Sequence, residues 1–108
     1  MKYYRERKEV VETGREMYRS AMTVGTWGNI SKKINGKDLF AITPSGVDYK
    51  KMKAEDVVIL DFAGEVVDGR KKPSTEKHLH RYLYKNREDI EAIVHTHSIY
   101  ASAMAAAR

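Results

Sequence analysis

The spacing of small and apolar residues over positions 3–23 is that of an amphipathic helix. They recur there every three or four positions, while charged residues occupy the other side. The predicted buried side consists of Val10, Gly14, Met17, Tyr18 and Ala21. Because a glycine costs a helix interior about 1 kcal/mol relative to alanine, Gly14 predicts close packing against a neighbouring element. Gly25 is the predicted end of the pattern.

Two short strands are predicted over residues 29–34 and 38–43. The dipeptide Asn35-Gly36 between them is a strong hairpin signal, because both residue types tolerate a positive φ. Further along, we expect a short polar helix over 50–56, a buried strand over the mostly apolar run 57–62, a turn at Ala63-Gly64 and a returning strand over 65–67.

The last third of the chain predicts a helix over 75–87, a strand over 90–97 and a helix beginning within 100–108. Leu79, Tyr82 and Leu83 are predicted to form the buried face of the first of these helices. Helices mixed with hairpin-type strands favour a layered α/β fold with mostly antiparallel strands. The Ala-rich segment 101–107 lacks a stop signal, so we expect the chain to be the N-terminal piece of a longer protein.

Composition limits the classes of function. The 108 residues, 42% hydrophobic, fit one globular domain over 1–108, and the lack of cysteine excludes disulfide scaffolds, thiolate zinc sites and cysteine nucleophiles. Lys and Arg exceed Asp and Glu by 20 to 15, a net charge of +5, but both signs are mixed and no nucleic-acid motif is present, so we expect no specific nucleic-acid partner. With neither a membrane-length apolar run nor a secretory signal, we expect a cytoplasmic protein and no membrane partner.

His95-Thr96-His97 at the end of an apolar strand is the sharpest chemical signal. Alternate strand residues point to the same face about 6.5–7 Å apart, so two imidazoles can converge on one metal ion. Neutral imidazole is a standard ligand for zinc and other divalent metals. The alternative is that His95 packs in the core and His97 is an ordinary polar residue at a strand end.

Glu76 follows Pro73-Ser74-Thr75 at a predicted helix start. Taken alone, it is expected to cap the helix, where an acidic residue suits the helix dipole. Near a metal, its carboxylate could instead serve as a ligand or general base, which would suit proton abstraction next to a carbonyl. His78 and His80 on the same helix fall on different faces, so we expect them to be ordinary helix residues.

Three short segments combine glycine with hydroxyl side chains: Gly28-Asn29-Ile30-Ser31, Thr43-Pro44-Ser45-Gly46 and Ser74-Thr75. Each could offer backbone N–H groups or hydroxyls to an anion, and the third lies at a helix N-terminus, where the dipole favours negative charge. Each alone is typical of a turn or cap. Together with a metal pair and a carboxylate, they predict a metal-assisted site for a small phosphorylated carbonyl compound.

Four motifs in this order resemble the class II aldolase/adducin-like family: Gly25-Thr26-Trp27-Gly28-Asn29-Ile30-Ser31, Ile42-Thr43-Pro44-Ser45-Gly46, Pro73-Ser74-Thr75-Glu76 and Val94-His95-Thr96-His97-Ser98. The likeness covers essentially the whole chain but only the N-terminal part of a typical member. It implies a three-layer α/β/α fold with a central, mainly antiparallel sheet, truncated here at the C-terminus, and a homotetramer with sites between subunits.

The resemblance also implies roles for individual residues. By position, the segments that hold the substrate phosphate match Gly28, Asn29, Ser45, Gly46, Ser74 and Thr75. His95 and His97 match two zinc ligands, and Glu76 matches a residue that binds zinc in the empty enzyme and acts as catalytic acid/base with substrate. The implied reaction is cleavage of a ketose 1-phosphate, of the L-fuculose 1-phosphate type, to dihydroxyacetone phosphate and an aldehyde. Another divalent metal could replace zinc, because imidazole and carboxylate accept several.

Other functions within the resemblance stay open. Pentulose-phosphate 4-epimerases carry Asp where Glu76 stands, so this residue favours an aldolase, while methylthioribulose-1-phosphate dehydratases share the two-histidine strand. The adducin branch is a non-catalytic interaction domain that lacks the metal histidines. Family members have a third zinc histidine and a C-terminal tyrosine in positions beyond Arg108. We therefore expect the 108-residue chain alone to bind zinc weakly and to show little turnover.

Overall fold

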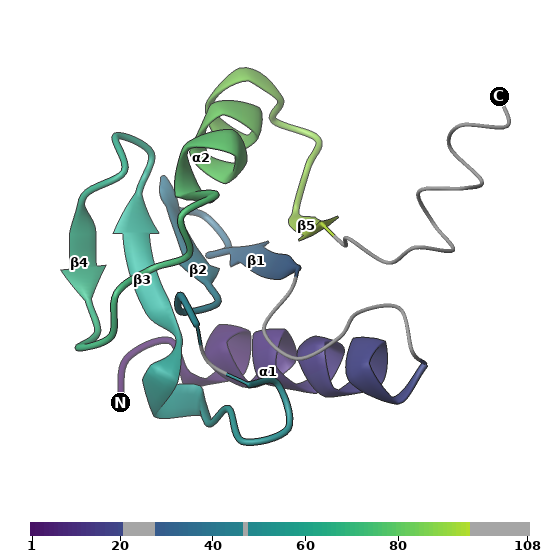
Figure 1. Cartoon of the computed structure of the whole chain (residues 1–108). Helices are drawn as coiled ribbons and strands as arrows, with labels where there is room; N and C mark the ends of the chain where they lie inside the picture. Colours follow the sequence, from purple (N-terminus) through teal and green to yellow (C-terminus); the bar gives the residue numbers. More distant parts are fainter. Residues whose placement is uncertain (21–27, 47, 96–108) are drawn as a thin grey trace, which may run out of the picture.

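The structure is a computed structural model that describes residues 1–20, 28–46 and 48–95 (Figure 1). In chain order its elements are α1 (Tyr4–Arg19), β1 (Asn29–Lys33), β2 (Leu39–Ile42), the 3-10 helix η1 (Ala54–Asp56), β3 (Val58–Asp61), β4 (Val66–Asp68), α2 (Lys77–Asn86) and β5 (Ala92–His95). Neither α-helix in these ranges is long and apolar enough to cross a membrane.

The strands form one sheet in the order β4-β3-β2-β1-β5, and every neighbouring pair is antiparallel, as predicted. The predicted hairpin turn joins β1 to β2: Gly36 has a φ of 76°, and the amide of Ile34 donates to the carbonyl of Leu39 at 2.9 Å. Asn29 pairs with His95 on one side of β1, and Ser31 pairs with Ile42 on the other. The start of β1 therefore lies beside the ends of β2 and β5.

Helices cover both faces of the sheet, which confirms the three-layer arrangement (Figure 1). Because side chains alternate between faces, successive residues of β2 and β3 enter two separate clusters. The cluster under α1 includes Val10, Val11, Met17, Ile30, Ala41, Val57 and Ile59. The cluster under α2 consists of Phe40, Ile42, Val58, Leu60 and Tyr84. Burial on both faces is why the run beginning at residue 57 is apolar without alternation.

The contact between Gly14 and Tyr49 confirms the close packing predicted for α1. A Cβ at Gly14 would lie 2.6 Å from Cδ1 of Tyr49 and 3.0 Å from Cε1. Tyr49 is only 2% exposed, so its surroundings hold the ring in place. Tyr49 follows a turn formed by Ser45 and Gly46, and its contact with Gly14 anchors that part of the chain to α1.

Several elements are shorter than predicted. Helix α1 ends at Arg19 with Ser20 as its C-cap; the remaining predicted helix positions 21–23 and the predicted stop at Gly25 lie outside the described residues. The predicted helix 50–56 is reduced to η1, because residues 49–51 form a turn. Strand β5 begins at Ala92, whereas positions 96–97 and the predicted helix within 100–108 lie outside the described residues.

The predicted buried face of α2 is wrong. Leu79 and Tyr82 are 40% and 61% exposed, and Leu83 is half-buried. The buried residues of this helix are instead His80 and Tyr84. The apolar pattern misplaces the face because it counts a histidine as a surface residue, although a buried imidazole is stable where both ring nitrogens have partners.

The two buried polar side chains of α2 meet Ser31 on β1. Oγ of Ser31 lies 2.6 Å from Nδ1 of His80 and 2.7 Å from the hydroxyl oxygen of Tyr84. All three residues are at most 3% exposed. Burial, with a smaller contribution from the charge of His95, lowers the pKa of His80 to about 4, so its imidazole is neutral near pH 7.

We expect Gly14→Ala to lower the free energy of unfolding by about 1–3 kcal/mol, because the new methyl group overlaps the Tyr49 ring. Without that overlap, alanine would stabilise the helix by about 1 kcal/mol. Thr13→Ala, on the exposed side of the same helix, is the matched control and should be neutral or slightly stabilising. Urea denaturation of the wild-type, Gly14→Ala and Thr13→Ala proteins measures these free energies of unfolding. A Gly14→Ala protein more stable than wild type would contradict the close contact between Gly14 and Tyr49.

Stability should also fall on acidification between about pH 6.5 and pH 4. In that window a histidine with the ordinary pKa of about 6.5 binds a proton in the unfolded chain, whereas His80 stays neutral in the folded one, so acid favours unfolding. His80→Gln should flatten this part of the stability profile. The exposed His78→Gln is its control and should keep the slope. An unchanged slope in His80→Gln, measured by denaturation at several pH values, would show that another group carries it.

Candidate anion-binding and metal site

The three segments of glycine and hydroxyl residues lie together at one end of the sheet. The amide of Thr43, just after β2, donates to the carbonyl of Ile30 on β1 at 3.0 Å. The amide of Ser74 donates to the carbonyl of Thr43 at 3.0 Å, and the amide of Ser45 donates to the carbonyl of Lys72 at 2.8 Å. Segments far apart in the chain are therefore hydrogen-bonded neighbours.

The exposed parts of these segments suit an anion. Ser45 and Gly46 form an exposed turn in which Gly46 has a φ of 73°. Thr75 is exposed and immediately precedes Glu76, the N-cap of α2. The positive end of the dipole of this ten-residue helix is directed toward this region. Backbone amides and hydroxyls at such a helix start are typical of phosphate-binding sites.

Glu76 occupies the N-cap position of α2, but its side chain makes no capping hydrogen bond. The hydroxyl of Ser74 instead accepts the backbone N–H of Glu76, at 3.2 Å. The prediction that the Glu76 carboxylate caps the helix is therefore wrong. Glu76 is half-buried and precedes His80 by four positions, and its carbonyl accepts the amide N–H of His80 at 3.4 Å.

His95 ends β5 and pairs with Asn29 across the sheet. Asn29 is 4% exposed, and its Oδ1 lies within hydrogen-bond distance of Nε2 of His80. The charge of His95 also contributes to the lowered pKa of His80. Strand pairing and the docking of α2 thus bring Asn29, His80 and His95 into one region, with Glu76 at the adjoining end of the helix.

His80 is the residue of this region that sequence reasoning missed. The two-residue spacing of His78 and His80 shows only that these two side chains lie on different faces of the helix. The signal that could have identified His80 is its four-residue spacing from Glu76, which is typical of residues on one helix face. Both ring nitrogens of His80 have hydrogen-bond partners, Ser31 and Asn29, so the imidazole is not available as a metal ligand.

The donors predicted for a metal ion fit zinc by chemical type. Glu76 offers carboxylate oxygen and His95 offers imidazole nitrogen, both common zinc ligands. The other predicted ligand, His97, lies outside the described residues. Within the ranges that the structure describes, no group of three or more His, Asp or Glu side chains is placed to hold a metal ion. The set of Glu76, His95 and His97 stays a prediction.

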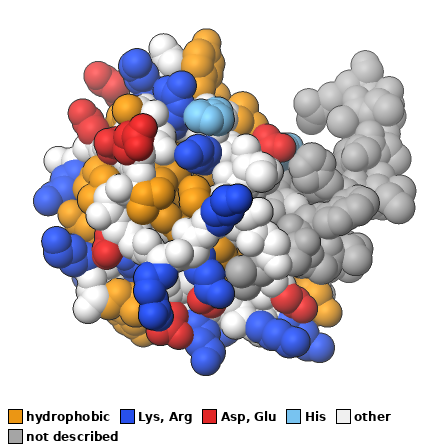
Figure 2. Space-filling model, turned by 60° about the vertical axis from the view of Figure 1, so that its left-hand side comes forward, with side chains coloured by type: hydrophobic (Ala, Val, Ile, Leu, Met, Phe, Trp, Pro, Cys, Tyr) orange, Lys and Arg blue, Asp and Glu red, His pale blue; other side chains and the backbone are white. Residues whose placement is uncertain are grey.

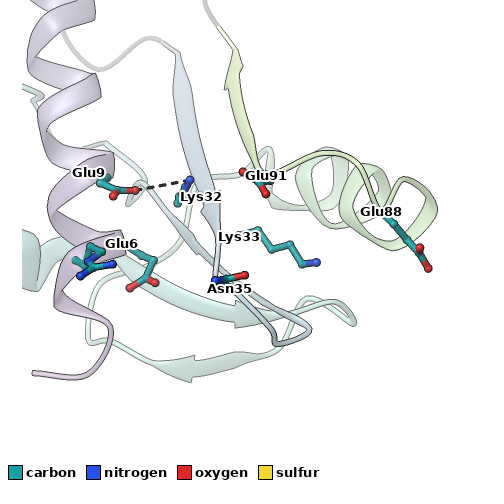
Figure 3. A pocket seen from close by; sticks show the side chains of 8 residues that line it. Glu6, Glu9, Lys32, Lys33, Asn35, Glu88 and Glu91 are labelled. Atoms are coloured by element: carbon teal, nitrogen blue, oxygen red, sulfur yellow. Dashed lines mark ion pairs between the residues drawn. The ribbon is translucent and has the colours of Figure 1, made fainter.

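A separate polar cavity of about 240 Å³ opens beside the other end of β1, between α1 and β5 (Figure 3). Its lining carries both signs of charge, including Glu6, Lys33 and Glu91, and Lys32 pairs with Glu9 at 3.8 Å. Figure 2 likewise shows both signs of charge spread over one face of the molecule, as the mixed sequence predicts. Because the lining includes none of the three glycine and hydroxyl segments, the cavity is not part of the candidate site.

Comparison with known proteins identifies the family of the chain. The family model of the class II aldolase and adducin N-terminal domain matches residues 8–108 of the sequence. A 5-deoxy-D-ribulose 1-phosphate aldolase of Bacillus thuringiensis serovar kurstaki is 50% identical over 101 residues, which are 94% of this chain and 47% of that protein.

Solved structures agree with this result. An L-fuculose 1-phosphate aldolase superposes with a TM-score of 0.87 at 40% identity, covering 95% of this chain and 49% of that one. An L-fuculose-1-phosphate aldolase from Thermus thermophilus gives a TM-score of 0.76 at 26% identity, covering 96% and 51%. The chain spans about half the length of these relatives. With its fold and its matched motifs, it belongs to the class II aldolase and adducin N-terminal domain family.

Proposed function

We propose that this chain forms the phosphate-binding and proton-transfer part of a metal-dependent aldolase that cleaves a ketose 1-phosphate to dihydroxyacetone phosphate and an aldehyde. The observation that carries the proposal is the meeting of three amide- and hydroxyl-bearing segments with Glu76 and His95 at one end of the sheet. Two relatives whose names specify aldolases for ketose 1-phosphates add support.

In this proposal the substrate phosphate is held where the three segments meet. Its ligands are the backbone and side chains of Gly28, Asn29, Ser45, Gly46, Ser74 and Thr75. The N-terminus of α2 adds favourable electrostatics, because the positive end of its dipole faces the negative group. A sugar phosphate would thereby be fixed at its phosphate end, with the carbon chain free to reach toward Glu76.

Glu76 is proposed as the acid/base that moves the proton at the carbon beside the carbonyl. Its half-buried carboxylate is not used for capping, which supports this role. Together with His95 and His97, the same carboxylate would hold a divalent ion, with zinc as the proposed metal. Such an ion, when bound, supplies a Lewis acid that polarises the substrate carbonyl.

The sugar is proposed to be a deoxyketose 1-phosphate. The names of the two relatives specify 5-deoxy-D-ribulose 1-phosphate and L-fuculose 1-phosphate as substrates. Cleavage between C3 and C4 yields dihydroxyacetone phosphate from both, but acetaldehyde from the first and lactaldehyde from the second. The relative named for the first shares 50% identity with this chain, so we propose 5-deoxy-D-ribulose 1-phosphate as the better substrate.

Glu76→Gln should lower kcat by about 10²–10⁴-fold while leaving the fold and phosphate binding intact, because the amide cannot accept the proton. The assay uses the protein as its gene encodes it, with both deoxyketose phosphates, and follows dihydroxyacetone phosphate. The exposed Glu88→Gln is the matched control and should keep the wild-type rate.

Two outcomes would contradict this function. A Glu76→Gln protein with near-wild-type turnover would remove the proposed acid/base. A wild-type protein that interconverts pentulose 5-phosphates and cleaves neither 1-phosphate would assign the epimerase reaction instead.

A further inference from the structure

The side chain of His80 is completely buried and is hydrogen-bonded at both ends. On one side its Nδ1 lies 2.6 Å from Oγ of Ser31, which in turn lies 2.7 Å from the hydroxyl oxygen of Tyr84. On the other side its Nε2 meets Oδ1 of Asn29. Four buried polar side chains from α2 and β1 therefore form one continuous chain that ends at a residue of the proposed phosphate site.

The hydrogen-bonding capacities of these groups set the direction of the chain. Oδ1 of Asn29 can only accept, so the hydrogen of the neutral imidazole must be on Nε2. Nδ1 of His80 then accepts from the hydroxyl of Ser31, whose oxygen accepts from the hydroxyl of Tyr84. Every link has one donor and one acceptor, as a buried polar network requires.

This direction fixes which end of the Asn29 side chain is bound to His80. A carboxamide has an accepting oxygen at one end and a donating amino group at the other. With the oxygen bound to His80, the amino group is directed away from His80. If the carboxamide were free to rotate by 180°, its oxygen would take that place and would repel an anion.

We propose that His80 is a positioning residue, which holds the Asn29 carboxamide so that its amino group donates to the phosphate of the substrate. The inference rests on the proposed function, because it assumes that Asn29 contacts the phosphate. His80 itself does not contact the substrate; it acts through Asn29. The residues that support it, Ser31 and Tyr84, hold the imidazole in one tautomer.

The first test measures the dissociation constant of inorganic phosphate in the protein as its gene encodes it. His80→Met removes both ring nitrogens at similar volume and should weaken binding roughly tenfold, the effect of one hydrogen bond to a charged group. His80→Gln keeps an N–H donor near the position of Nε2 and should recover most of the affinity. The exposed His78→Met is the matched control and should bind phosphate like wild type.

A double-mutant cycle separates positioning from a merely structural role. If His80 acts through Asn29, the protein with both Asn29→Ala and His80→Met should bind phosphate no more weakly than Asn29→Ala alone. Additive losses would overturn the inference. In turnover, His80→Met should raise KM by the same factor as the phosphate dissociation constant and leave kcat largely unchanged, whereas loss of folded protein would lower kcat alone.

The tautomer gives a readout that needs no variant to fold. Long-range ¹H–¹⁵N NMR of the wild-type protein should show the hydrogen of His80 on Nε2, and a hydrogen on Nδ1 would overturn the inference. Failure of the proposed function is distinguishable: the wild-type protein would then bind no phosphate and cleave no ketose phosphate. If the wild-type protein binds phosphate and the His80→Met protein binds it with the same dissociation constant, only the positioning role of His80 is rejected.

Discussion

The hydrogen bonds that Ser31 makes with His80 and Tyr84 determine how α2 is placed on the sheet. A helix packed only through apolar side chains could rotate or slide with modest cost, but here a rotation would leave buried polar groups unpaired. The helix is therefore fixed with its polar pair inward and Leu79 outward. Because Glu76 is one turn before His80, the same hydrogen bonds set the place of the proposed acid/base.

Antiparallel strand pairing brings the other segments of the candidate site together. With β1 between β2 and β5, its first residues lie beside the last residues of both neighbours: Asn29 pairs with His95 and Ser31 with Ile42. The chain leaving β2 meets the chain entering α2. The packing of Tyr49 against Gly14 holds the segment after the Gly46 turn from the opposite side of the sheet. The site is thus formed by loops whose ends are tied to regular elements, which limits their movement.

Local signals predicted the parts of this structure that depend on local physics. Asn35-Gly36 marked a turn because its backbone needs a positive φ, and Gly14 marked a close contact. The buried face of α2 could not be found in this way, since a partner 49 residues distant makes His80 a core residue. Arg7 was missed for the same reason: it is 2% exposed and pairs with Asp68 at 2.7 Å. Hydrophobic periodicity cannot identify polar residues whose partners lie far along the chain.

A neutral imidazole also suits the electrostatics of the proposed site better than a cationic side chain. A lysine or a charged histidine at position 80 would attract the substrate phosphate, but it would also place a positive charge four residues from the Glu76 carboxylate. Burial keeps His80 uncharged, as its lowered pKa indicates. Its effect on the phosphate then passes through the orientation of a neutral amide, so an anion can be bound while the nearby carboxylate stays available for proton transfer.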